Sequence, residues 1–313
     1  MTRTLSPLIP CAGLCAAIFL AACGDTEQVA PTPEGTGQDT SLPPRQKAIL
    51  LRARDARPPG TTFRHTATLT MNDAELITRR GEETLNGTTK VIMREIWEVE
   101  QVSANERLFT IEDMSLGYES VIGGKADKQR SESTLGDLPF KVTRASEAEP
   151  WVMVPPEGPL SPLQETEMRM LGKLWTETST ELYPEEPLDL GQTWEADPKA
   201  FGMIVSPRLK IDEGKVTCRL DEITVLRGER CGSISVDVDI AGTIAMGGSA
   251  GIKVQIALTG TVMRSLYKNY DMRTELKGSM QMEMEVPQQE MTISIDGVAE
   301  FLQLANMTAP EPE

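Results

Sequence analysis

Few residues of this sequence have the types and spacing that chemistry requires. Residues 247–251, with the sequence GGSAG, match the letters of a hydrolase nucleophile elbow, in which a strained strand-to-helix turn presents a serine to a histidine and an acid. Strand patterns flank this run on both sides, and the one histidine of the chain, His65, alternates onto an apolar face. We therefore interpret the run as a glycine-rich hairpin loop and His65 as a hydrogen-bonded core residue. We expect no catalytic residues and no enzymatic activity.

Three methionines, Met280, Met282 and Met284, share one face of a predicted strand. Thioethers can bind Cu(I), but no His or Cys lies near them in the sequence, and no zinc spacing, phosphate loop or EF-hand loop occurs in the chain. We interpret the methionines as adaptable packing or as the lining of an apolar ligand site, with no metal and no cofactor.

The amino-acid composition limits which classes of partner the protein can bind. The 313 residues are 39% hydrophobic and 25% charged, which is enough for a folded core. Aromatic residues make up 4% and the net charge is −16, so neither base stacking nor binding to a phosphate backbone is expected, and nucleic acid is excluded as a partner.

The amino terminus has the layout of an export signal. Arg3 gives a positive start, an apolar stretch follows over residues 5–22, and the stretch ends in the small residues Ala21 and Ala22 before Cys23. The run Leu-Ala-Ala-Cys resembles the lipobox of bacterial lipoproteins. The resemblance implies cleavage between Ala22 and Cys23 and acylation of Cys23, which makes a lasting membrane anchor. The residue after the cysteine is Gly24 and not the aspartate that marks retention in the inner membrane. The resemblance therefore favours a location at the outer membrane, with the domain facing the periplasm. The alternative is an ordinary secretory signal with a chance cysteine.

Loss of residues 1–22 would leave Cys218 and Cys231 as the remaining cysteines besides Cys23. In an oxidising compartment these two either form a disulfide or remain two small buried hydrophobes. A tight turn at Gly228 sets Cys218 opposite Asp237, so a disulfide requires a longer loop or a bulge near residues 221–222.

The chain divides into four segments. We expect a lipoprotein signal peptide at 1–22, the lipidated cysteine and a flexible tether at 23–45, a single β-rich periplasmic domain at 46–305, and a disordered tail at 306–313. The tether is rich in Pro, Gly, Thr and acidic residues and has almost nothing to bury.

The domain is dominated by a period of two, which predicts strands with one polar and one apolar face. The pattern is found at 62–71, 91–102 and 107–114, and it is clearest at 233–246, 252–266, 272–286 and from 291 onward. We predict a mainly β (α+β) fold, a strongly curved antiparallel sheet or half-barrel in which the last four strands form a meander. Matching apolar faces predicts the pairs Ile240–Leu258, Leu258–Met280 and Met284–Ile293.

Three glycines, Gly242, Gly260 and Gly278, fall on the apolar face, and the predicted register sets Gly260 opposite Gly278. Glycine in a strand permits a bend or a close approach, so Gly260 and Gly278 join the methionines as candidate ligand-lining residues. A helix is predicted after an N-cap at Ser161, with apolar residues at helical spacing: Leu163, Met170, Leu171 and Leu174. It is expected in or across the concave face, where it either fills the concavity or leaves room for a ligand.

A second resemblance concerns the folded domain. The lipobox, the tether, the mid-chain helix and a turn at 187–194 with the spacing Gly191-x-x-Trp194 resemble an uncharacterised β-rich family of bacterial lipoproteins. The domain of that family is similar to the curved sheet of lipoprotein-localisation factors, which shelter acyl chains. The resemblance implies a fold and, by analogy alone, a ligand class.

Three functions fit these observations. The first is a membrane-anchored carrier or sensor whose curved sheet binds a lipid or acyl chain. The second is a non-enzymatic envelope assembly or scaffold lipoprotein with a filled core and no ligand; its protein partner is not specified by the sequence. The third is a transmembrane β-barrel, which the missing aromatic girdles and the acylation signal oppose.

Overall fold

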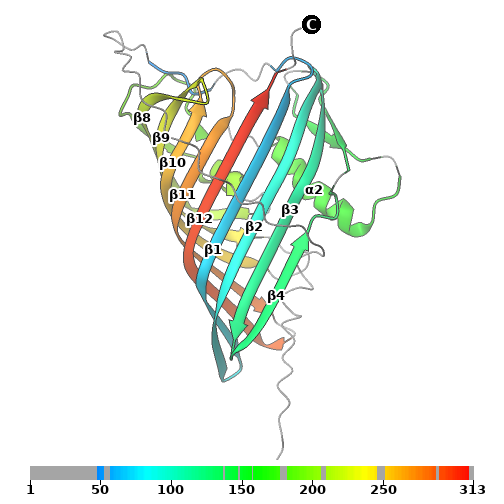
Figure 1. The fold of residues 1–313 in the computed structure, drawn as a ribbon, viewed down its shortest axis with the longest axis vertical. Coiled ribbons are helices and arrows are strands. Elements are labelled where there is room, and N and C mark those ends of the chain that lie inside the picture. Colours follow the sequence, from blue (N-terminus) through cyan, green and yellow to red (C-terminus); the bar gives the residue numbers. More distant parts are fainter. Residues whose placement is uncertain are drawn as a thin grey trace, which may run out of the picture.

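The computed structural model describes residues 48–52, 57–136, 138–146, 149–156, 158–176, 182–205, 209–244, 251–286 and 289–309. These residues form one antiparallel sheet and two helices, α2 (Pro162–Thr176) and α3 (Pro198–Val205) (Figure 1). The strands are β1 (Thr62–Arg80), β2 (Glu83–Ser103), β3 (Glu106–Ile122), β4 (Lys125–Glu132), β5 (Phe140–Thr143), β6 (Val152–Val154), β7 (Thr193–Ala196), β8 (Leu209–Leu226), β9 (Glu229–Ile244), β10 (Ile252–Ser265), β11 (Asp271–Val286) and β12 (Met291–Thr308).

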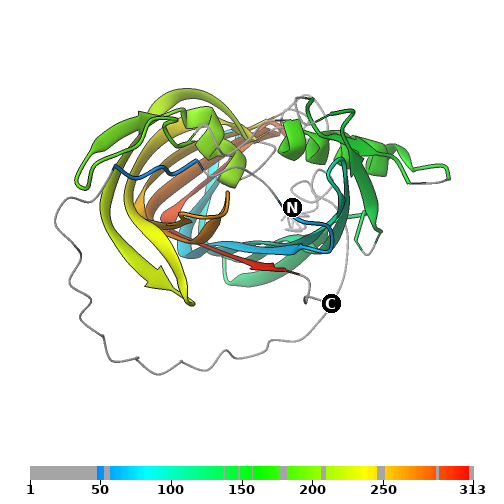
Figure 2. The ribbon, with the colours of Figure 1, turned by 90° about the horizontal axis from the view of Figure 1, so that it is seen from above.

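The 12-stranded sheet has the order β6-β5-β3-β2-β1-β12-β11-β10-β9-β8-β7, with β4 paired to β3. The first and last long strands, β1 and β12, are neighbours at its centre. The sheet does not close, and it curves strongly into a half-barrel (Figure 2). The predicted fold class is confirmed.

The predicted meander of β9 to β12 is confirmed, but two of its three registers are shifted. The pair Met284–Ile293 occurs as predicted. Ile256, however, pairs with both Ile240 and Met280, where Leu258 was predicted, a shift of two residues. The connections are longer than expected: the β10–β11 register shifts between Met263 and Arg264, and its last pair joins Arg264 to Asp271, before the predicted turn. Because a shift of two preserves the face of every side chain, the apolar surface stays intact.

The apolar faces of the strands line the concave side of the sheet. Ile240 and Met282, which the sequence assigns to one face, share it through the pairs Ile240–Ile256 and Val254–Met282. The opposite face carries cross-strand ion pairs, such as Lys277–Glu300 at 2.5 Å and Lys253–Glu285 at 3.3 Å. One face of the sheet is therefore polar and exposed to solvent, and the other is apolar and buried.

Gly260 and Gly278 lie where neighbouring strands approach too closely for a side chain. A Cβ on Gly260 would stand 1.9 Å from the Glu275 carbonyl oxygen, and one on Gly278 would stand 2.0 Å from that of Ala257. The predicted direct pairing of the two glycines is wrong, since Gly260 faces Leu276 and Gly278 faces Leu258. The close approach of a neighbouring backbone, one of the two roles expected of a glycine in a strand, is observed at both.

The predicted helix forms as α2. Ser161 and Gln164 make reciprocal capping bonds, from the Gln164 amide to the Ser161 hydroxyl at 3.3 Å and from the Ser161 amide to the Gln164 side chain at 2.9 Å. Its buried side chains are Met168 and Leu171, whereas Leu163 is 42% exposed, which corrects its expected burial. The side chains of Met170 and Leu174 lie outside the described part.

The second helix, α3, was not predicted, although its start has a sequence signal. Pro198 occupies the first turn, and the Asp197 carboxylate accepts a 2.9 Å hydrogen bond from the Lys199 amide. Its Phe201 is buried in the same apolar cluster as the concave face of β8 to β12. Among the described residues, no helix is long and apolar enough to cross a membrane.

The predicted tail at 306–313 begins too early. β12 continues to Thr308 because β1 offers backbone partners as far as Thr62, and the pairs Arg64–Asn306, Phe63–Met307 and Thr62–Thr308 extend the ladder. At the other end, the first described pairing joins Ile49 to Leu188, and Leu51 is buried. The predicted signal peptide and tether fall outside the described residues.

Candidate functional site

Two predicted sites lie outside the described residues. They are the cleavage and acylation site at Ala22 and Cys23, and most of the glycine-rich run, of which Gly251 alone is described. That run connects β9 to β10, which pair antiparallel from Ile244–Ile252 onward. The run is therefore followed by a strand, as the hairpin interpretation requires, and not by the helix of a nucleophile elbow.

Cys218 and Cys231 are free thiols that lie in two different apolar clusters. A bulge does occur between Leu220 and Glu222, where the sequence allowed one, but Cys218 then faces Val236. Val236 is five residues along β9 from Cys231, or about 17 Å at 3.3 Å per residue. This separation far exceeds the reach of a disulfide, so the structure has the alternative of two buried thiols. Burial raises the pKa of Cys218 to about 12, which keeps it protonated and inert.

The five predicted lining residues share the concave face. Met280 and Met284 are 3% and 7% exposed, and Met282 between them is half-buried. Inward-facing residues of the other strands extend this surface: Ile240 and Val238 of β9, Val254, Ile256 and Leu258 of β10, Ile293, Ile295 and Ala299 of β12, and Leu69 and Met71 of β1. The result is one continuous apolar surface across five strands.

The two described helices stand near the two ends of the strand order. α2 lies against β6 and α3 against β8. In the view from above, both helices lie toward the open side of the half-barrel, while β1, β11 and β12 form its opposite wall (Figure 2). Neither α2 nor α3 therefore packs directly on the central strands, which carry the methionines.

Two buried polar side chains lie side by side at one border of this apolar surface. Thr274 of β11 pairs directly with Gln303 of β12, and they are 1% and 7% exposed. Neither the Thr274 hydroxyl oxygen nor the Gln303 carbonyl oxygen has a hydrogen-bond partner. An unsatisfied buried polar group costs about 1–3 kcal/mol, and native proteins retain few of them. No sequence motif marks this pair, although both residues are polar at apolar-face positions of their strands.

The pair belongs to a row that crosses the concave face. Successive pairings place Thr274, Gln303, Ala67 and half-buried Glu95 in line across β11, β12, β1 and β2. On one side lie members of the larger apolar cluster: Leu69, Leu276 and Phe301. On the other side lie members of the smaller cluster: Phe63, Val99, Met272 and Ala305. This row, which we call the polar band, is polar except at Ala67, a member of the larger cluster, and it lies between the two apolar regions.

His65 lies beside this band, one inward position from Ala67 on β1. Its ring stacks on Trp97 with centroids 4.3 Å apart and planes 12° apart. Burial lowers the pKa of His65 to about 4, so the imidazole is neutral at pH 7. His65 is therefore a core residue, as expected, and it packs by stacking on the Trp97 ring.

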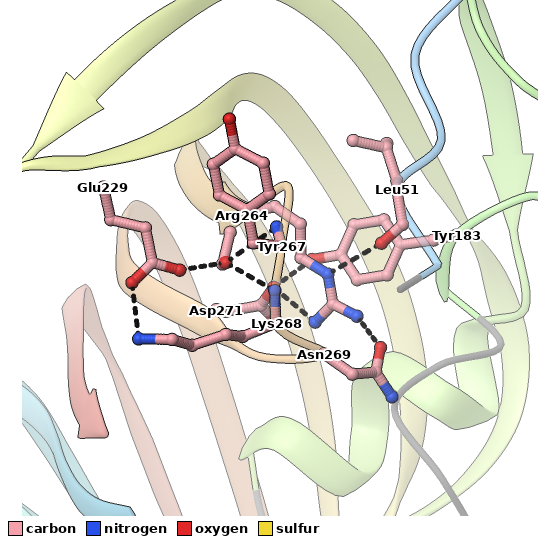
Figure 3. Close-up of polar contacts among 9 residues, drawn as sticks. Leu51, Tyr183, Glu229, Arg264, Tyr267, Lys268, Asn269 and Asp271 are labelled. Atoms are coloured by element: carbon pink, nitrogen blue, oxygen red, sulfur yellow. Dashed lines mark hydrogen bonds and ion pairs between the residues drawn. The ribbon is translucent and has the colours of Figure 1, made fainter. Parts of the chain in front are cut away.

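A second buried polar cluster lies at the end of the β10–β11 hairpin (Figure 3). Arg264 is 1% exposed and forms a 3.0 Å ion pair with Asp271. The guanidinium also donates to the Leu51 carbonyl at 3.2 Å and to the Asn269 side chain, and it lies 4.3 Å from the centre of the Tyr183 ring. Tyr183 in turn donates a 2.7 Å hydrogen bond to Asp271.

Each charge of this cluster is matched, which indicates a structural role. Burial and the nearby Asp271 carboxylate raise the pKa of Tyr183 well above its usual value, so the phenol remains a donor. Through Arg264 and Tyr183 the cluster joins the segment at Leu51 and the segment at 182–188 to the hairpin. Strict alternation with the inward-facing Met272 would place Asp271 on the polar face of β11, but the register shift after Met263 pairs Asp271 with Arg264 and leaves it buried.

Within the described ranges, no group of three or more His, Cys, Asp or Glu side chains is arranged to hold a metal ion.

No protein-family model matches the sequence, and no curated protein sequence matches it. Comparison with solved structures finds distant likenesses. A structure titled as lipid–protein interactions in lipovitellin is 11% identical and has a TM-score of 0.37; the alignment covers 82% of this chain and 26% of that one. The chain thus spans about a quarter of the length of lipovitellin.

Two bacterial structures are also similar to this chain. The COG4313 outer membrane channel from Pseudomonas putida F1 is 9% identical with a TM-score of 0.21, and the alignment covers 81% of this chain and 97% of the channel. A DUF1329 family protein from Desulfovibrio piger is 8% identical with a TM-score of 0.13, and the alignment covers 82% and 88% of the two chains. Likenesses at this level show nothing of the function of this chain.

Proposed function

We propose that this protein is a membrane-anchored envelope lipoprotein that binds an apolar ligand, a lipid or an acyl chain, on the concave face of its sheet. The observation that carries the proposal is the continuous apolar surface across β9, β10, β11, β12 and β1, centred on half-buried Met282. A flexible, polarisable methionine face suits a chain-like ligand of variable shape.

The proposed location rests on the sequence alone. The lipobox around Cys23 supports acylation, and Gly24 favours the outer membrane with the domain facing the periplasm. Binding rather than catalysis is proposed because His65, the one histidine, is buried against Trp97 and held neutral.

The test uses the full chain with Cys23→Ser, which removes the proposed acylation site. This protein is incubated with a bacterial envelope lipid extract and examined by native mass spectrometry. The proposal expects a lipid adduct that survives gentle desolvation. Met282→Glu should weaken binding by roughly 30-fold, because a carboxylate on the apolar lining costs about 2 kcal/mol against the ligand.

Ser279→Glu is the matched control, since Ser279 is exposed on the other face of the same strand. It should bind like the parent protein. A bare protein mass in repeated preparations, with circular dichroism confirming a folded sheet, would reject ligand binding.

A scaffold lipoprotein with a filled core is the second candidate. The observation that favours it is the low exposure of Met280 and Met284, together with exposed apolar residues at hairpin ends, namely Val225 at 62% and Tyr267 at 63%. This candidate predicts no lipid adduct, and it predicts that Val225→Ser or Tyr267→Ser alters association with a protein partner.

A further inference from the structure

The polar band on the concave face contains two oxygen atoms that are buried and unpaired. The Thr274 hydroxyl and the Gln303 carbonyl lie on directly paired residues of β11 and β12. Two unpaired polar atoms far apart would each be a local packing defect. Two adjacent unpaired oxygens on a proposed ligand-binding face indicate one ligand group that hydrogen-bonds to both. That partner must be polar and must reach the concave face.

The chemistry of the two oxygens selects the partner. The Gln303 carbonyl oxygen can accept a hydrogen bond but cannot donate one, whereas the Thr274 hydroxyl can do either. A ligand hydroxyl fits both, because it donates its proton to Gln303 and accepts one from Thr274. A carboxylate or phosphate fits poorly, because it has no proton to give to Gln303 when ionised.

The surrounding charges agree with a neutral group. Half-buried Glu95 lies in the same row, and His65 beside it is neutral. The buried cation on β10, Arg264, is already engaged by Asp271, Asn269 and the Leu51 carbonyl. Arg264 is therefore already paired within the fold and is not available to an anionic head group.

The apolar regions on both sides of the band account for the rest of the ligand. One side is formed by residues such as Leu276 and Phe301, and the other by Met272 and Ala305. We propose that the concave face takes a neutral, hydroxyl-bearing lipid whose hydroxyl binds between Thr274 and Gln303. This inference rests on the proposed function and specifies its ligand class.

Three probes of equal chain length test the proposal: oleyl alcohol, oleate and 1-octadecene. Each competes with a fluorescent apolar reporter for the full chain carrying Cys23→Ser. We expect oleyl alcohol to bind at least about five times more tightly than either other probe.

The variants Thr274→Val and Gln303→Leu remove the polar atoms with little change of shape. Each should weaken binding of oleyl alcohol about three- to tenfold, the worth of one hydrogen bond, and leave octadecene binding unchanged or stronger. Both should fold, because removal of an unsatisfied buried oxygen is neutral or stabilising. The matched controls are Thr259→Val and Gln255→Leu, which change exposed residues on the outer face of β10 and should alter no affinity.

The outcomes separate the inference from the proposed function. If all three probes bind equally and the variants change nothing, the hydroxyl site is wrong and the pair is bridged by a trapped water, while apolar binding stands. Stronger binding of oleate also overturns the hydroxyl site alone. If no probe displaces the reporter from any folded protein, the proposed function itself fails.

Discussion

Burial of His65 against Trp97 couples the stability of the fold to pH. The pKa of His65 falls from 6.5 to about 4 on folding because burial disfavours the charged ring. Between these values the unfolded chain binds a proton that the folded chain does not, so stability decreases as the pH falls from 6.5 to 4. The loss attributable to His65 should approach about 3 kcal/mol.

Urea unfolding at several pH values measures this effect as the difference between the parent protein and His65→Phe, which keeps an aromatic ring beside Trp97. Other titrating groups cancel in the difference. The free energy of unfolding of the parent should fall more steeply between pH 6.5 and 4. Parallel curves for the two proteins would show that His65 is protonated without cost in the fold.

The ion pair of Arg264 with Asp271 should be the most sensitive polar contact of the hairpin end. Arg264→Met leaves a buried carboxylate uncompensated and should lower the free energy of unfolding by about 3–5 kcal/mol. Lys268→Met removes the partly exposed pair with Glu229 and should cost less than about 1 kcal/mol. Denaturant titration compares the two, and equal losses would contradict the structural role of the buried cluster.

Sequence reasoning at the residue scale identified the methionine face but missed the polar contacts within it. Alternation assigns Met280, Met282 and Met284 to one side whatever the exact register. Arg264 and Asp271 were missed because a single bulge changes which side Asp271 faces. The Thr274–Gln303 pair depends on the pairing of β11 with β12, and the significance of the pair depends on the unsatisfied oxygens, which no pattern of letters reveals.

At the scale of the elements, neighbouring strands approach each other too closely at the inward glycines for a side chain to fit. Gly278→Ala should destabilise the protein by about 1–3 kcal/mol or more, because the new Cβ would overlap the Ala257 carbonyl. Gly117→Ala on β3 is the control, since its Cβ would meet no atom closer than 3.8 Å. Thermal unfolding measures both, and tolerance of alanine at residue 278 would show that the strands are farther apart than described.

Elements were predictable to the extent that local signals define them. The N-cap residue Ser161 marked the start of α2, and the period of two marked the long strands. The registers of β9–β10 and β10–β11 were two residues off because the length of a connection is set by bulges and loop conformation. The hydrophobic pattern constrains only whether that shift is odd or even.

The whole molecule is proposed to be held at a membrane through Cys23. Cys23→Ser should abolish incorporation of labelled palmitate and should release the protein from the membrane fraction. Cys218→Ser should retain both properties, because Cys218 is buried within the sheet. Radiolabelling and fractionation test this, and undiminished labelling of Cys23→Ser would exclude the lipobox interpretation.

The arrangement of the whole sheet lay beyond sequence reasoning. A meander of sequential strands follows from short connections, and β9 to β12 form one. The pairing of β1 with β12 joins segments more than 200 residues apart, such as Leu69 and Phe301, and no local pattern specifies it. That pairing places β1 and β2 beside the methionine strands and so completes the concave face.

The measurement that tests the concave-face proposal most directly is photocrosslinking with a diazirine-bearing fatty alcohol, followed by peptide mass spectrometry. The account predicts adducts on inward residues of the central strands, with Met280, Met282 and Met284 foremost. Adducts confined to outward residues of the same strand, such as Lys277, Ser279 and Gln281, or adducts on none of these strands, would contradict it.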